Sequence, residues 1–69
     1  MTHWLIVYDK PKGDLLLLQA FADGREALHE RFVLERKHAD NTDLEIVVLG
    51  AGTLADVRRT HQRYFRSIA

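Results

Sequence analysis

The sequence contains no cysteine, so neither a disulfide bond nor a thiolate metal site can stabilise this chain of 69 residues. Long apolar runs are also absent: the longest, residues 4–8, has five residues, whereas a membrane-spanning helix needs about 20. The first residues lack the basic leader and the longer apolar core of a signal peptide. We therefore expect one domain, residues 1–69, in the cytoplasm and without contact with a membrane.

Residue types that carry enzyme chemistry are scarce. Ser67 is the one serine, and no serine or threonine lies in a nucleophile elbow. The four histidines show neither the H-x-x-x-H nor the H-E-x-x-H spacing of a metal site. Asp9 and Asp14 flank a turn, where carboxylates ordinarily cap the backbone. We therefore expect a protein that is not an enzyme and that has no cofactor and no bound metal.

Charge is balanced over the whole chain, with ten basic and ten acidic side chains, but not locally. Residues 1–53 hold six Lys and Arg against nine Asp and Glu, a net charge of −3. Residues 54–69 hold four Arg against one Asp, a net charge of +3. This asymmetry is typical either of a site for an anionic partner or of a chain that attracts its own copy.

The first third of the chain predicts a β-hairpin. Residues 4–8 are β-branched and aromatic, and residues 15–21 return after a polar turn. Pro11 presets the backbone for a type I turn, and Gly13 can adopt the left-handed conformation that follows it.

The rest of the chain predicts a helix, a strand and a second helix. Asp23 is a good N-cap for a helix over residues 24–39, and a third strand follows at residues 44–49. Thr53 caps a second helix over residues 54–67.

Together these elements predict an α+β domain of order ββαβα, with a three-stranded sheet built on the N-terminal hairpin and two packed helices. A right-handed crossover through the first helix would make the second and third strands parallel, so we expect a mixed sheet. Apolar residues run continuously along each strand, so both faces of the sheet must be covered. The helices either lie on opposite faces, or one face meets a second protein.

The first helix carries apolar residues on more than one side. Leu28, Phe32 and Ala39 share one stripe, Ala27 and Leu34 form a second, and Val33 lies alone on the opposite side. A small chain without disulfides gains stability by sharing its core, so the pattern predicts a homodimer. We expect the interface at five residues: Trp4, Tyr8, Ala27, Val33 and Leu34.

The second helix is amphipathic. Its apolar stripe consists of Leu54, Val57, His61, Tyr64, Phe65 and Ile68. We expect His61 to be a neutral core or interface histidine rather than a metal ligand or a base. The polar side offers candidate contacts for a nucleic acid or another partner, namely Arg58, Arg59, Gln62, Arg63 and Arg66. Arginines on one helix face can contact phosphates or bases, although a calculated isoelectric point of 6.9 is low for such a domain.

Residues 50–55 fit the form G-x-G-x-x-A between a strand and a helix, as in dinucleotide-binding sites. No later strand supplies the acidic residue that such sites use, and Asp56 would repel a phosphate. We therefore interpret the two glycines as a sharp turn from strand to helix. The sequence thus predicts a small non-enzymatic interaction module, a homodimer that binds another macromolecule; the alternative is a nucleic-acid-binding regulator that uses its C-terminal helix.

Overall fold

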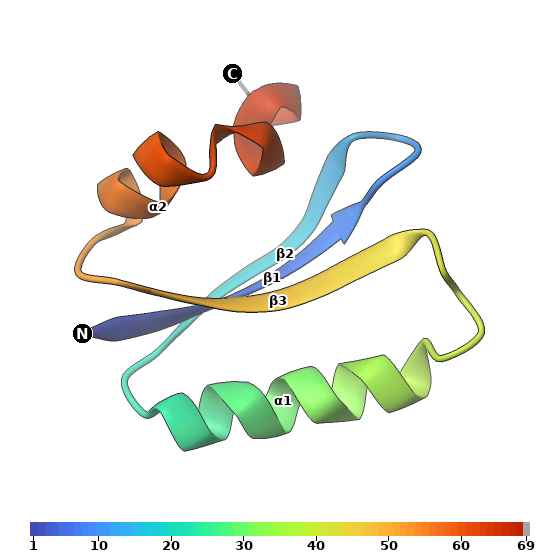
Figure 1. Ribbon diagram of the computed structural model, residues 1–69, viewed down its shortest axis with the longest axis horizontal. Helices are drawn as coiled ribbons and strands as arrows, with labels where there is room; N and C mark the ends of the chain where they lie inside the picture. Colours follow the sequence, from blue (N-terminus) through green and yellow to red (C-terminus); the bar gives the residue numbers. More distant parts are fainter. Residues whose placement is uncertain (69) are drawn as a thin grey trace.

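The computed structural model describes residues 1–68 of the chain, with side chains as far as Arg66 (Figure 1). The elements in chain order are β1 (Thr2–Asp9), β2 (Asp14–Phe21), α1 (Gly24–Lys37), β3 (Leu44–Ala51), α2 (Leu54–Thr60) and a short 3₁₀ helix, η1 (Gln62–Ile68). The α+β class and the order ββαβα predicted from the sequence are confirmed.

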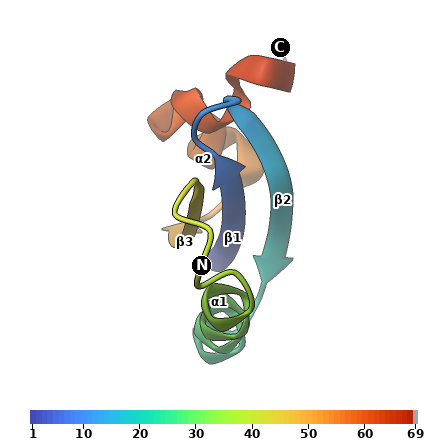
Figure 2. The same cartoon turned by 90° about the vertical axis from the view of Figure 1, so that its right-hand side faces the viewer.

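The three strands form one sheet in the order β2-β1-β3, with β1 in the centre (Figure 2). Both strand pairs are antiparallel. The prediction of a mixed sheet is therefore wrong. β2 and β3 do run in the same direction, but β1 lies between them and is antiparallel to both, so every strand pair in the sheet is antiparallel. This order places the most apolar strand in the middle, where Leu5 and Ile6 are fully buried.

The hairpin forms as predicted. Gly13 has φ +67°, and its amide donates a hydrogen bond of 2.8 Å to the carbonyl of Asp9. Further along, the register between β1 and β2 shifts by one residue, so that Val7 faces Leu17 and Tyr8 faces Leu15. The skipped residue in β2 forms a β-bulge and is exposed.

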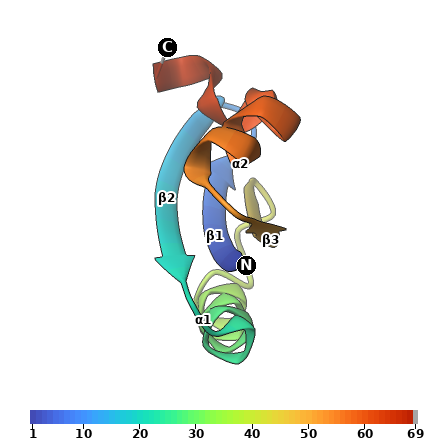
Figure 3. The ribbon, with the colours of Figure 1, turned by 90° about the vertical axis from the view of Figure 1, so that its left-hand side faces the viewer.

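The helices cover opposite faces of the sheet. In Figure 1 the sheet is seen edge-on, with α1 on one side and α2 and η1 on the other, and Figures 2 and 3 show the same three layers from the two ends. This arrangement resolves the choice that the sequence left open, because neither face of the sheet needs a second protein to cover it.

Alternation along β1 divides the core into two halves. Ile6 and Tyr8 point toward α2 and η1, where they pack with Val57, Tyr64 and Phe65. The odd-numbered residues of β1 point the other way, toward α1. The molecule measures 32 × 30 × 13 Å, and the shortest dimension runs across the three strands. Both edge strands therefore lie at the surface.

The predicted second helix is interrupted at His61. The α-helical part ends at Thr60, whose hydroxyl donates to the carbonyl of Asp56, and the chain continues as η1. The break redirects the chain, because α2 packs against β3 whereas η1 packs against β2. A straight helix would follow one line over the sheet and could not reach both edges. Tyr64 and Phe65, two successive residues, are thereby both buried.

Candidate interaction surface

The outer side of α1 carries exposed apolar side chains. Leu28 and Phe32 are 54% and 57% exposed, and they lie one helical turn apart. Ala27 is fully buried and Leu34 is half-buried, so the stripe that the sequence assigned to an interface faces the sheet. The prediction of which stripe lies outside is therefore wrong: Ala27 and Leu34 face the sheet, and Leu28 and Phe32 are exposed to solvent.

Two other predicted interface residues are also engaged within the chain. Tyr8 is buried and meets Tyr64 in an edge-to-face contact, with ring centroids 5.1 Å apart. Trp4 is half-buried, and its indole Nε1 donates a hydrogen bond of 3.2 Å to the carbonyl of Ala51. Val33, at 40% exposure, is the one member of the predicted set on the outside.

A hollow of about 300 Å³ lies beside the exposed stripe. It is lined by Leu28, Arg31, Phe32 and Glu35. Arg31 and Glu35 form an ion pair, with Nε 2.5 Å from Oε1. The guanidinium of Arg36 lies over the ring of Phe32, 5.7 Å from its centroid, so part of this ring meets a cation rather than water.

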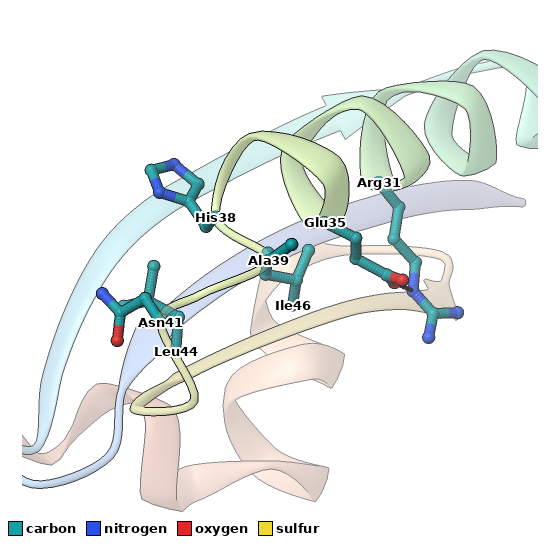
Figure 4. A pocket seen from close by; sticks show the side chains of 7 residues that line it. All are labelled: Arg31, Glu35, His38, Ala39, Asn41, Leu44 and Ile46. Atoms are coloured by element: carbon teal, nitrogen blue, oxygen red, sulfur yellow. Dashed lines mark hydrogen bonds and ion pairs between the residues drawn. The ribbon is translucent and has the colours of Figure 1, made fainter.

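A second hollow, of about 340 Å³, continues from the first toward β3. It shares the pair Arg31 and Glu35 and adds Leu44 and Ile46 from the edge strand. Figure 4 shows the ion pair extending from α1 toward β3, while Ala39 lies close to Ile46. The stripe of α1, the ion pair and the outer edge of β3 therefore form one continuous surface. We define the β3-side surface as Leu28, Arg31, Phe32, Glu35 and the free edge of β3.

The free edge of β3 lacks the usual protection against pairing with another strand. Natural edge strands are blunted by bulges, prolines or outward charges. Within the described residues β3 pairs only with β1, its register is regular over eight residues, and it contains no proline, lysine or arginine. Its one charged side chain, Glu45, is bound to residues of η1. The opposite edge, β2, carries the bulge at Leu16.

The other flank of α1 is charged. A hollow of about 400 Å³ beside β2 is lined by Phe21, Arg25, Glu26, His29 and Glu30. Four of these five residues carry polar or charged groups, but most of the surface that they and Phe21 present to the hollow is apolar. The two most exposed apolar side chains of α1, Leu28 and Phe32, lie on the β3 side.

Most of the arginines proposed as a nucleic-acid contact are held by the protein itself. The guanidinium of Arg58 lies over the ring of Phe65, 5.3 Å from its centroid, and Arg59 pairs with Asp56 at 3.1 Å. Arg63 turns back toward the sheet. Gln62 donates a hydrogen bond to the carbonyl of Arg59, and Arg66 is exposed. Because the helix breaks at His61, these side chains do not form one continuous face.

Arg63 belongs to a cluster that joins η1 to β3. Its Nη2 lies 2.6 Å from Oε2 of Glu45, and the hydroxyl of Tyr64 donates to the same oxygen at 2.8 Å. The hydrogen bond from Arg63 lowers the pKa of Glu45. Burial, together with the hydrogen bond to the Glu45 carboxylate, raises the pKa of Tyr64 to about 12. Sequence reasoning missed this cluster because its members are 18 and 19 positions apart.

His61 is half-buried at the end of α2. Its Nδ1 lies 2.8 Å from the hydroxyl of Thr60, and its ring stacks on that of Tyr64 with centroids 6.1 Å apart. These contacts agree with a structural histidine. The side chain of Ile68, the last member of the predicted stripe, lies outside the described residues.

The glycine motif at residues 50–55 does not form a phosphate cradle. Gly52 lacks the positive φ that a left-handed turn would require, and α2 has only seven residues. Across residues 1–68, no group of three His, Cys, Asp or Glu side chains is arranged to hold a metal ion. No helix in the same range is long and apolar enough to cross a membrane.

Comparisons with known proteins return no relative of this chain. No family model, no curated protein and no solved structure matches it. A function for this chain must therefore be inferred from the geometry of the β3-side surface.

Proposed function

We propose that this chain is a non-enzymatic protein-interaction module of the cytoplasm that binds a protein partner through the β3-side surface. The observation that carries the proposal is the juxtaposition of an unprotected strand edge with the exposed side chains of Leu28 and Phe32.

Strand addition supplies the physical basis. The outer edge of β3 presents unpaired N–H and C=O groups, and an added strand would pair with them while its side chains contact the flank of α1. Leu28 and Phe32 would supply the apolar contact that gives such an interface affinity beyond its backbone hydrogen bonds. Leu28 and Phe32 are adjacent on α1 and more than half exposed, so a partner could bury both side chains together.

Site-specific photo-cross-linking in cells of the native host tests the proposal. A benzophenone amino acid replaces Phe32 in one variant and Val33 in another, and adducts are identified by mass spectrometry. Val33 is a matched control because it is also exposed on α1 but is turned about 100° around the helix from Phe32 and lines neither hollow of the β3-side surface. We expect a protein adduct from position 32 and none from position 33. Equal labelling from both positions, or none from position 32, would refute the proposal.

A further inference from the structure

We infer that the occupant of the β3-side surface is a second copy of this chain, bound by antiparallel pairing of β3 with the partner's β3 about a two-fold axis. This inference rests on the proposed function and names its partner. It predicts a continuous six-stranded sheet in which the free edge of β3 no longer exists.

The symmetry of the pairing brings the two copies of α1 together. A two-fold axis perpendicular to the sheet makes the paired strands antiparallel and keeps both α1 helices on the same face. The helices then run antiparallel to one another, with their β3-side flanks facing across the axis. One symmetric contact therefore covers the strand edge and the exposed stripe at once.

The lengths of the two elements place that stripe at the axis. The start of β3 at Leu44 lies beside His38 and Ala39 at the end of α1. The distance along β3 from Leu44 to its middle, at Val47 and Val48, is about 12 Å. The same distance along α1, measured back from its C-terminal end, spans about eight residues. That position is near residue 30, midway between Leu28 and Phe32. In the dimer, Leu28 of one copy would therefore face Phe32 of the other.

The charges on the β3-side flank of α1 do not oppose a second copy. Arg31 and Glu35 neutralise each other on this flank, whereas Arg25, Glu26 and Glu30 line the hollow beside β2. Antiparallel packing of the two helices also places their dipoles in opposite directions, which is favourable.

The available area meets what a dimer needs. An eight-residue strand is about 27 Å long, a 14-residue helix is about 21 Å long, and the strip from strand edge to outer helix is roughly 20 Å high. This strip amounts to about 500 Å² per copy and about 1,000 Å² in total, the lower limit for a specific interface. The predicted dimer is therefore one that dissociates on dilution.

Sedimentation equilibrium from micromolar to millimolar concentration tests the pairing. We expect the wild-type mass to approach twice 8.0 kDa as the concentration rises. The double variant Leu28→Glu/Phe32→Glu should remain at the monomer mass, whereas Val33→Glu should dimerise like the wild type. All three substituted positions are exposed, so far-ultraviolet circular dichroism should show folded protein in each case. A wild-type protein that stays monomeric throughout, or a double variant that still dimerises, would overturn the inference.

Amide hydrogen exchange separates strand pairing from contact between helices alone. In the dimer, the amides on the outer edge of β3 should be protected, and dilution or the double substitution should remove this protection. The outer amides of β2 should exchange rapidly under all conditions, since that edge stays open. Rapid exchange along β3 in the dimeric wild type would refute the strand pairing, with no variant needed.

The cross-linking experiment distinguishes failure of this inference from failure of the proposed function. Adducts between two copies at position 32 support the pairing. Adducts at that position to other polypeptides alone would overturn the pairing while leaving the interaction module supported.

Discussion

Removing the hydroxyl of Tyr64 should destabilise the protein in a way that depends on pH. Tyr64→Phe keeps the ring that packs against Tyr8 but removes the hydrogen bond of 2.8 Å to Glu45. A hydrogen bond to a charged group contributes about 1.5–3 kcal/mol. Glu45 keeps its contact with Arg63, so no buried carboxylate is left without a partner. We therefore expect the lower end of this range, about 1.5 kcal/mol, out of a total of about 3–10 kcal/mol for a chain of this size.

The sign of the pH dependence follows from the raised pKa of Tyr64. The pKa is 10.0 for an unperturbed tyrosine and about 12 in the folded protein. The hydroxyl's contribution is therefore fully present below pH 10 and is lost as the pH rises toward 12, because the unfolded chain ionises first. The linkage amounts to about 1.4 kcal/mol by pH 11, so the advantage of the wild type over Tyr64→Phe should almost vanish there.

Urea unfolding followed by far-ultraviolet circular dichroism measures this difference at about pH 8 and about pH 11. Tyr8 is present in both proteins, so subtracting the two curves removes its titration. A free-energy difference between wild type and variant that is the same at both pH values would show that the Tyr64 hydroxyl does not titrate as the structure implies.

The remaining predictions concern local features and are read from thermal or urea unfolding. Arg63→Gln should cost about 1 kcal/mol because it removes a contact with the half-buried Glu45, whereas Arg59→Gln, at an exposed pair, should cost no more than about 0.5 kcal/mol; equal effects would refute the assignment of Arg63 to the cluster. Gly13→Ala should cost about 1 kcal/mol from its φ of +67° alone, since the added Cβ would meet no atom closer than 3.6 Å. Thr53→Ala should cost about 1 kcal/mol, because the hydroxyl accepts a hydrogen bond from the amide of Asp56 as an N-cap. Gly52→Ala should leave the free energy of unfolding nearly unchanged, because Gly52 has no positive φ and the new Cβ would lie 3.7 Å from its nearest neighbour; a large loss of stability would contradict the junction between β3 and α2 that the structure shows.

The face that α1 presents to the sheet could not be read from sequence. Both apolar stripes of this helix have the right spacing, and nothing within the helix ranks one above the other. The small side chain of Ala27 allows the backbone of α1 to approach the sheet, so this residue is fully buried. Leu28 and Phe32 are larger and remain outside. The sequence thus predicted that Ala27 and Leu34 remain outside, whereas the structure buries Ala27 against the sheet and leaves Leu28 and Phe32 exposed.

The arginines do not form the continuous helix face that the sequence predicts, for a related reason. Helical periodicity assumes that the helix continues, and no proline or glycine lies between Thr53 and the end of the chain. Only the packing of η1 against β2 shows why the helix ends at Thr60. Once it ends, Arg63 turns toward Glu45, a partner 18 positions earlier in the chain.

The sequence by itself determined the order of the elements and the features that depend on near neighbours. The turn at Gly13, the caps at Asp23 and Thr53 and the pair of Arg31 with Glu35 each join residues within four positions, so local chemistry specifies them. Tertiary structure alone decided the central place of β1, the opposite placement of the helices and the break at His61. Each of these depends on how apolar surface from distant segments is buried most completely, and that quantity is a property of the assembled fold rather than of any one segment.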